Sequence, residues 1–195
     1  MHWSAADTVA AVAANNGGTS SLAGLRDAAL VALASDCLPR LSEPGAVQVE
    51  DIAAEPDGSA RLIVHRSKTD QDGRGAVLYI SGSTMRQIAA WQKAGAVHAG
   101  PLFRRIRRGD RVEASAITDR AARSIIRARA AKTWIEGNVS GRGLRIGTAQ
   151  SLAAAGAGLV ELQQAGRWDS PSMPGHYARG QFDVRGAVAK LRYGA

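Results

Sequence analysis

The chain has 195 residues, of which 45% are hydrophobic, 22% are charged and 5% are aromatic. This length and composition indicate one domain with an aliphatic core, and they exclude a large multidomain enzyme and a disordered chain. The net charge is +8 and is unevenly placed, because residues 101–150 contain 12 Arg and Lys against four acidic residues. Of the 25 basic residues, 21 are Arg. A basic patch rich in guanidinium groups is typical of a protein that binds a polyanion.

The cysteine and histidine content excludes several kinds of site. Cys37 is the only cysteine, so no disulfide within the chain and no cysteine-based zinc site can form, which favours a reducing compartment. The four histidines, at positions 2, 65, 98 and 176, lack the i, i+4 spacing of a helical metal pair. No apolar stretch is long enough to cross a bilayer. We therefore expect a cytoplasmic protein with no metal, no other cofactor and no membrane contact.

The first half of the chain predicts a helix and a small sheet. Apolar residues recur at helical spacing from Ala23 to Cys37, so this segment is expected to be a core helix that Pro39 ends or kinks. Three β-rich runs follow, at Val47–Ile52, Arg61–His65 and Ala76–Ile80. Turn residues separate these runs, which predicts a three-stranded antiparallel meander.

The rest of the chain predicts helices. The candidate segments are Ser83–Ala94, Ser115–Lys132, Gly143–Ala155, Leu159–Gly166 and Phe182–Leu191. Ser115 and Thr118 are candidate N-caps, and Gly156 and Gly166 are candidate helix stops. The predicted fold class is α+β, mostly helical, with the small antiparallel sheet on one edge.

Two segments in the first half carry polar residues suited to phosphate chemistry. Arg40 and Glu43 lie three residues apart just after the first predicted helix, and Lys68 lies where a β-run enters a polar turn. Taken alone, the first pair is more often a surface ion pair. A lysine in a turn is usually solvated, so neither segment is specific by itself.

Three further segments lie in the second half. Ser140–Arg145 places glycines and two arginines, Arg142 and Arg145, at the start of a predicted helix, where backbone amides and the helix dipole favour an anion. Gly166–Trp168 and Met173–Arg179 contain Trp168 and Tyr177. An isolated Trp or Tyr is more often a packed side chain than part of a site.

The order and spacing of these segments resemble those of the catalytic domain of the tyrosine recombinases, the phage integrase family. The resemblance covers nearly the whole chain and rests on collinear motifs, Ser140-Gly-x-x-Leu-Arg145, Gln164-Ala-Gly-Arg-Trp168 and His176-Tyr-Ala-Arg179. It implies that residues 1–195 form a single catalytic domain with the tyrosine recombinase fold. It also implies that the helical core-binding domain, which members usually carry at the N-terminus, is absent.

The resemblance implies a role for each matching residue. These residues are Arg40, Lys68, Arg142, Arg145, Trp168 and Tyr177, with Glu43 as a supporting residue. Arg40 and Arg145 match the arginines that hold the scissile phosphate, and Lys68 matches the general acid for the leaving 5′ hydroxyl. Trp168 matches a phosphate contact, and Tyr177 matches the nucleophile. The implied activity is site-specific DNA strand cleavage and rejoining through a 3′-phosphotyrosyl intermediate, without metal or ATP.

Elementary chemistry agrees with these roles. The transition state at phosphorus gathers charge on the non-bridging oxygens, which preorganised guanidinium groups stabilise. A tyrosine phenol has an ordinary pKa of about 10, so attack near neutral pH needs a cationic neighbourhood or a base.

Double-stranded DNA is the expected partner, bound by a homotetramer that is monomeric without DNA. The candidate backbone-binding residues are Arg104, Arg105, Arg107, Arg108, Arg111, Arg123 and Arg127. Val184, Ala187, Val188 and Leu191 follow helical spacing near the C-terminus. This pattern suits a helix that packs on its own domain or in a groove of a neighbouring subunit.

The sequence departs from the family pattern in two places. Arg142 stands where the family usually has His, and an arginine binds phosphate but cannot exchange a proton with the tyrosine. Pro39 and the Pro44-Gly45 pair flank Arg40 and Glu43, so these side chains are expected to shift. Two alternatives stay open, a catalytically impaired DNA-binding remnant and an enzyme that relaxes supercoils like a type IB topoisomerase. Without a core-binding domain, weak and salt-sensitive DNA binding is expected.

Overall fold

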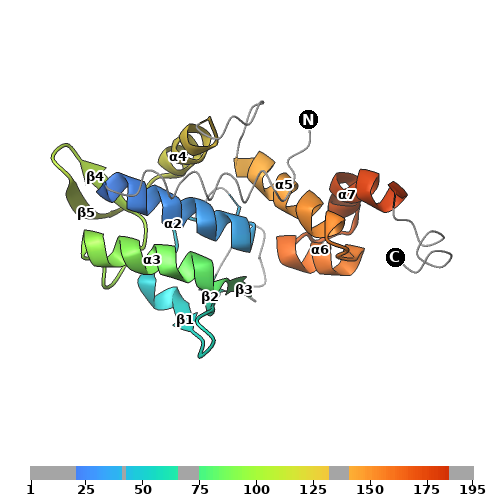
Figure 1. Cartoon of the computed structure of the whole chain (residues 1–195), viewed down its shortest axis with the longest axis horizontal. Helices are drawn as coiled ribbons and strands as arrows, with labels where there is room; N and C mark the ends of the chain where they lie inside the picture. Colours follow the sequence, from blue (N-terminus) through green and yellow to red (C-terminus); the bar gives the residue numbers. More distant parts are fainter. Residues whose placement is uncertain (1–20, 41–42, 66–74, 132–140, 185–195) are drawn as a thin grey trace.

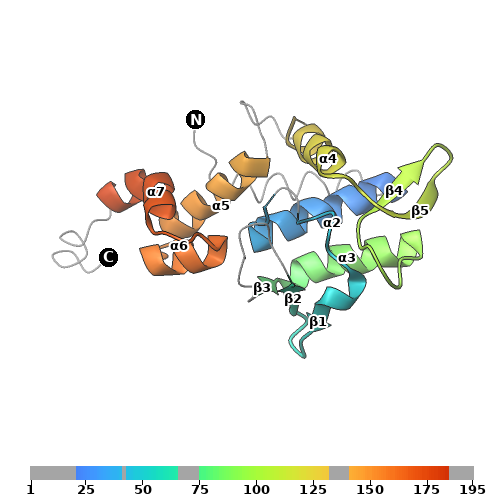
Figure 2. The ribbon, with the colours of Figure 1, turned by 180° about the vertical axis from the view of Figure 1, so that it is seen from behind.

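The computed structural model describes residues 21–40, 43–65, 75–131 and 141–184. Its elements form two groups, shown in Figures 1 and 2: α2, α3, α4 and the strands make one, and α5, α6 and α7 make the other. The second group lies beside the C-terminal end of α2 in both views. Within the described ranges, no helix has the length and apolar character needed to cross a membrane.

Helix α2 (Leu22–Cys37) is the centre of the core. The Ser21 hydroxyl caps its start by accepting a hydrogen bond from the Gly24 amide at 3.0 Å. Every residue from position 28 to 34 is buried, because α3 and α4 lie on opposite sides of this helix (Figure 1). The helix ends with Leu38 in the left-handed conformation, directly before Pro39. The predicted core helix is thus confirmed, and its end directs Arg40 toward the α5–α7 group.

The helix predicted at Ser83–Ala94 is confirmed as α3 (Gly82–Gly95), which packs along α2. Its buried Trp91 donates the indole N–H to the Leu102 carbonyl at 2.8 Å. Cys37, the last residue of α2, is also buried. The pKa of its thiol is raised to about 12, mainly because of this burial and secondly because of the negative charge of Asp36. The thiol therefore stays protonated at neutral pH and acts as a small apolar core residue.

The three-stranded antiparallel sheet is confirmed. It consists of β1 (Ile52–Ala54), β2 (Ala60–Val64) and β3 (Ala76–Ile80), in that order. Leu62 of β2 pairs with Leu78 of β3, and both are buried against the core.

The strand predicted at Val47–Ile52 is wrong over most of its length. Residues Val49–Asp51 form a 3₁₀ turn, η1, and β1 begins only at Ile52. The reason is the Asp51 carboxylate, which accepts a hydrogen bond from the Gln48 amide at 2.8 Å. This side-chain contact stabilises a turn in a segment whose apolar residues suggest a strand.

A second, two-stranded sheet was not predicted. Strands β4 (Arg104–Arg107) and β5 (Arg111–Ala116) form a hairpin, and Gly109 and Asp110 have positive φ in its turn. Ser115 therefore lies in a strand and is not an N-cap. Helix α4 (Asp119–Ala131) starts after Thr118, whose hydroxyl accepts a hydrogen bond from the Ala121 amide at 3.2 Å. The Thr118 cap is thus confirmed.

The C-terminal group contains α5 (Gly141–Ala154), α6 (Leu159–Gly166) and α7 (Ser172–Val184). The first two were predicted within two residues, and Gly156 has a φ of 102° where α5 gives way to a turn. Helix α7 begins ten residues before the predicted Phe182. Pro174 fits this helix because it lies in the first turn, where no intrahelical amide bond is needed. The rest of the predicted C-terminal helix, residues 185–191, lies outside the described residues, so the predicted contact of this tail stays a prediction.

Candidate active site

A pocket of about 420 Å³ lies where the end of α2 meets the α5–α7 group. Its lining residues are Arg40, Arg145, Ile146, Arg167, Trp168, Asp169, Ser170, Met173 and Tyr177. Four of the residues singled out in the sequence are therefore in one place: the two predicted phosphate-binding arginines, the tryptophan and the tyrosine. They come from the α2 end, α5, the α6–α7 loop and α7.

Arg40 and Glu43 form a tight turn directly after α2. The Arg40 amide donates to Glu43 Oε2 at 2.7 Å, and the Glu43 amide donates back to the Arg40 carbonyl at 2.9 Å. The Glu43 residue is buried, at 8% exposed. Pro39 directly follows Leu38, the left-handed residue that ends α2, and the Arg40 side chain lines the pocket. The shift expected from the flanking prolines stays a prediction.

Arg145 on α5 also lines the pocket. Its guanidinium stacks over the Trp168 ring, with Cζ 4.7 Å from the ring centroid, and Nη2 donates to the Gly166 carbonyl. Burial, followed by the positive charges of Arg167 and Arg40, lowers the pKa of Arg145 from 12.5 to about 10. Arg145 is still charged at neutral pH, in a site where cations outnumber anions.

Trp168 folds back over the end of α6. A Cβ added at Gly166 would overlap its six-membered ring, so only glycine leaves room for this placement. The ring centroid of Trp168 is 6.0 Å from that of Tyr177, with the planes tilted by 55°. Trp168 thus packs against both Arg145 and Tyr177.

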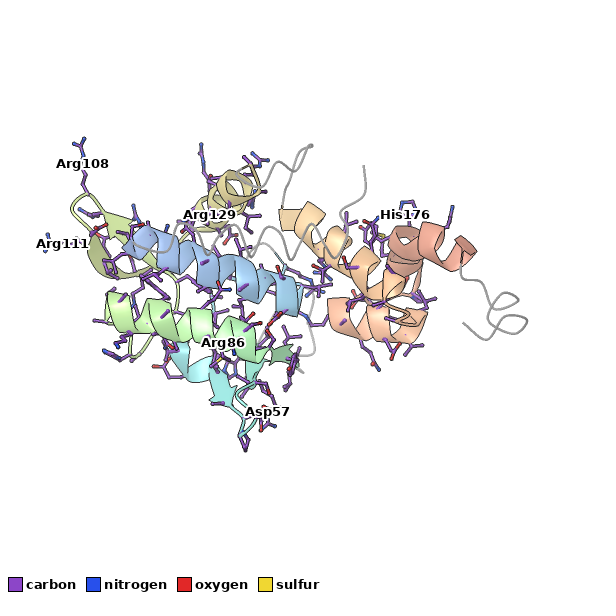
Figure 3. All side chains as sticks on the ribbon, viewed as in Figure 1. Asp57, Arg86, Arg108, Arg111, Arg129 and His176 are labelled. Atoms are coloured by element: carbon purple, nitrogen blue, oxygen red, sulfur yellow. The ribbon has the colours of Figure 1, made fainter. Side chains whose placement is uncertain are left out.

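Tyr177 is half-buried on α7. The negative charge of its phenolate raises the pKa of Arg145, although less than the opposing effects lower it. The His176 ring lies 5.8 Å from the Tyr177 ring at an angle of 67°, on the exposed side of α7 (Figure 3).

Two curated proteins are similar to the chain in sequence. The integrase/recombinase XerD homologue of Selenomonas ruminantium is 29% identical over 163 residues, which cover 80% of this chain and 48% of the relative. The Cre recombinase of Escherichia phage P1 is 26% identical over 186 residues, which cover 86% of this chain and 53% of the relative. The chain thus spans about half the length of these curated relatives. No protein-family model matches it.

Solved structures agree on the architecture. The XerA recombinase superimposes with a TM-score of 0.73 at 15% identity, covering 95% of this chain and 64% of the other. The XerH recombinase, bound to its palindromic difH substrate, superimposes with a TM-score of 0.75 at 12% identity, covering 98% and 53%. The fold is that of a tyrosine recombinase catalytic domain. The predicted fold class is therefore confirmed.

Two of the residues matched to tyrosine recombinase positions are not placed by the structure. Lys68 lies outside the described residues. Arg142 lies in the first turn of α5, but its side chain is outside the described part of the chain. Their roles stay predictions.

Arg167 also lines the pocket, although it was not among the residues predicted from the sequence. Its guanidinium donates to both Glu43 oxygens, at 3.0 Å from Nη1 and 2.6 Å from Nη2. Its carbonyl accepts a hydrogen bond from Arg40 Nη2 at 3.2 Å. A usable signal was its position between Gly166 and Trp168, within a motif already matched to the family.

The seven arginines predicted to bind the DNA backbone differ in availability. Arg108 and Arg111 are exposed at the tip of the β4–β5 hairpin (Figure 3). Arg105 and Arg107 form ion pairs with Glu113, and the partly buried Arg104 donates to the carbonyls of Pro101 and Ala99.

On α4, the predicted Arg123 and Arg127 are exposed. Arg129 on the same helix is buried and pairs with Asp27 at 3.1 Å, so it serves packing. The exposed face of α4 and the hairpin tip therefore carry the cations most available to a polyanion.

Proposed function

We propose that this domain cleaves and rejoins DNA strands, with Tyr177 as the nucleophile and a 3′-phosphotyrosyl intermediate. The observation that carries the proposal is the convergence of Tyr177, Arg40 and Arg145 in one pocket. A phosphodiester is the substrate class that suits this combination, because guanidinium groups bind its non-bridging oxygens and a phenol can attack its phosphorus.

Arg40 and Arg145 both hold the phosphate in the pocket. Each guanidinium presents planar N–H donors to an oxygen, and the charge that develops in the transition state strengthens both contacts. Trp168 supports this arrangement by stacking on Arg145, 4.7 Å from its Cζ. Its indole N–H is a further donor for the phosphate.

In the chemical step, the Tyr177 oxygen attacks phosphorus and the bond from phosphorus to the 5′ oxygen breaks. The phenolic proton leaves to solvent, and Lys68 protonates the departing 5′ oxygen. In the reverse step, a 5′ hydroxyl attacks the phosphotyrosine and releases Tyr177. The ester bond energy is kept throughout, so joining needs no ATP. Arg142, which stays protonated, acts here as a phosphate ligand and not as a proton acceptor.

The proposed partner is double-stranded DNA in the cytoplasm, and the proposed assembly is a homotetramer on two DNA sites. Support comes from the exposed arginines of α4 and of the hairpin tip, and from XerH, which was solved on its difH substrate. Residues 1–195 act in this proposal as one catalytic domain. Binding by this domain alone is expected to be weak and to fall steeply with salt, because each phosphate contact releases counterions.

A covalent-adduct assay tests the proposal. The chain is incubated with nicked duplexes from a sequence-randomised pool, in which the strand end beyond the nick diffuses away and prevents rejoining. We expect an adduct that resists denaturation, is present with Tyr79→Phe and is lost with Tyr177→Phe. Tyr79 is the matched control, since it is 63% exposed on β3.

An adduct that persists in Tyr177→Phe, or no adduct across a range of pH and salt, would contradict the proposal. Relaxation of a supercoiled plasmid without exchange between two sites would show the same chemistry with the outcome of a topoisomerase.

A further inference from the structure

We propose that Arg167 is a positioning residue for Arg40. By neutralising Glu43 and anchoring the Arg40 side chain, it holds the Arg40 guanidinium toward the phosphate pocket. The inference deepens the proposed function and rests on it, because the anion bound there would be the scissile phosphate.

The first observation is that the guanidinium of Arg167, and not that of Arg40, donates hydrogen bonds to the Glu43 carboxylate. Both terminal nitrogens of Arg167 donate to it, at 2.6 and 3.0 Å. Arg40 Nη1 makes only a longer ion-pair contact with Glu43 Oε1, at 3.9 Å, which is beyond hydrogen-bond distance. A bidentate pair is the stronger arrangement, and burial of Glu43 to 8% exposure strengthens it further. Without Arg167, this carboxylate would attract Arg40, its neighbour in the same turn.

The second observation concerns the Arg167 backbone. Arg167 caps the end of α6 with a φ of 51°, a left-handed conformation that disfavours residues with a Cβ and usually selects glycine. This conformation directs the carbonyl of Arg167 to Arg40 Nη2, at 3.2 Å. A long cationic side chain at such a position indicates that its contacts offset the backbone strain.

The third observation is where these residues come from. Arg40 and Glu43 follow α2, whereas Arg167 belongs to the loop between α6 and α7. The side chain and the carbonyl of Arg167 therefore connect the two groups of elements at the pocket. The Nε atoms of Arg145 and Arg167 are buried and have no hydrogen-bond partner among the described residues. The described residues around the pocket thus provide fewer hydrogen-bond acceptors than these arginines could use, as expected where an anion binds.

The backbone conformation allows a clean substitution. Arg167→Gly keeps a residue that accepts positive φ and retains the carbonyl, so it removes the side chain with its guanidinium and leaves the backbone contact to Arg40 in place. The matched control is Ala96→Gly, because Ala96 caps α3 in the same conformation, with a φ of 49°, and lies outside the pocket. Thermal unfolding of each variant shows whether it remains folded at the assay temperature.

The probe is inorganic phosphate, titrated at constant ionic strength. Binding is followed by the NMR signal of the Trp168 indole N–H, which is assigned because it is absent from the spectrum of Trp168→Phe. We expect the dissociation constant to rise at least fivefold in Arg167→Gly and to stay unchanged in Ala96→Gly. Unchanged phosphate affinity in folded Arg167→Gly would overturn the proposal.

Two double variants separate positioning from direct contact. If Arg167 acts through Arg40, then Arg40→Ala with Arg167→Gly binds phosphate no more weakly than Arg40→Ala alone. Adding Glu43→Gln to Arg167→Gly should restore most of the affinity, because no carboxylate then competes for Arg40. Additive losses, or no rescue, would assign Arg167 to the anion itself or to folding alone. The titration needs no strand cleavage, so it remains informative if the wild-type chain forms no Tyr177 adduct and the proposed function fails.

Discussion

At the residue scale, the site depends on an aromatic ring that packs against a glycine. Gly166 is the last residue of α6, as predicted, and Arg167 takes the left-handed conformation after it. Gly166 also leaves space for the Trp168 ring and accepts a hydrogen bond from Arg145 at its carbonyl. The sequence shows the glycine, but only the folded chain shows which of its properties is used.

We predict that Gly166→Ala displaces Trp168 from Arg145 and Tyr177. A methyl group at this position overlaps the ring, and such overpacking costs about 1–3 kcal/mol of unfolding free energy. The rate of Tyr177 adduct formation should fall about tenfold or more, as misplacement of a site group commonly causes. Gly158→Ala is the control, because a Cβ there meets only the end of the Glu161 side chain, at 3.5 Å. Wild-type rates and stability in Gly166→Ala would refute the packing role.

At the element scale, prediction succeeded where apolar periodicity was strong. The predicted bounds lie close to the observed ones for helices α2, α3, α5 and α6 and for strands β2 and β3. The β4–β5 hairpin was missed because its strands are rich in arginine and place only a few apolar residues inward, such as Ile106 opposite Val112. The turn residues Gly109 and Asp110 were the available signal. The basic residues of this region therefore fall into two parts. Arg104 to Arg111 belong to the hairpin, whereas α4 starts at Asp119, and not at Ser115, and carries the arginines that follow.

We expect the exposed face of α4 to contribute to DNA affinity in a salt-dependent way. Arg123→Ala and Arg127→Ala should each weaken binding to duplex DNA and reduce the slope of log affinity against log salt by about 1. Arg86→Ala is the control, because Arg86 is exposed on α3, on the other side of α2 (Figures 1 and 3). Fluorescence anisotropy over a salt series measures both quantities. If the slope of log affinity against log salt is the same for all three variants, the DNA does not contact this face of α4.

At the scale of the whole molecule, the site lies where two groups of elements meet. The end of α2 contributes Arg40 and Glu43, and the α5–α7 group contributes Arg145, Arg167 and Tyr177. The ion pair between Glu43 and Arg167 joins residues 124 positions apart in the sequence. The side chains of the two partners are only 9% and 14% exposed. This pair is therefore placed to affect stability as well as activity.

We predict that Glu43→Ala destabilises the domain by about 3 kcal/mol, because it leaves the Arg167 charge buried without its partner. Glu55→Ala is the matched control. Glu55 pairs with Arg61, but these side chains are 31% and 62% exposed, and exposed pairs contribute about 0–1 kcal/mol. Urea unfolding measures both. Similar losses in the two variants would show that the Glu43 pair is no stronger than a surface contact.

The sequence by itself determined the family resemblance, the fold class, the three-stranded sheet and the candidate residues Arg40, Arg145, Trp168 and Tyr177, because motif order and apolar periodicity are local properties of the chain. The tertiary structure decided how these residues meet. It brought Arg167 to Glu43, stacked Trp168 on Arg145, and separated the exposed arginines of α4 from the buried Arg129. These contacts join segments far apart in the chain, and burial and charge pairing depend on three-dimensional proximity, which spacing along the sequence does not specify.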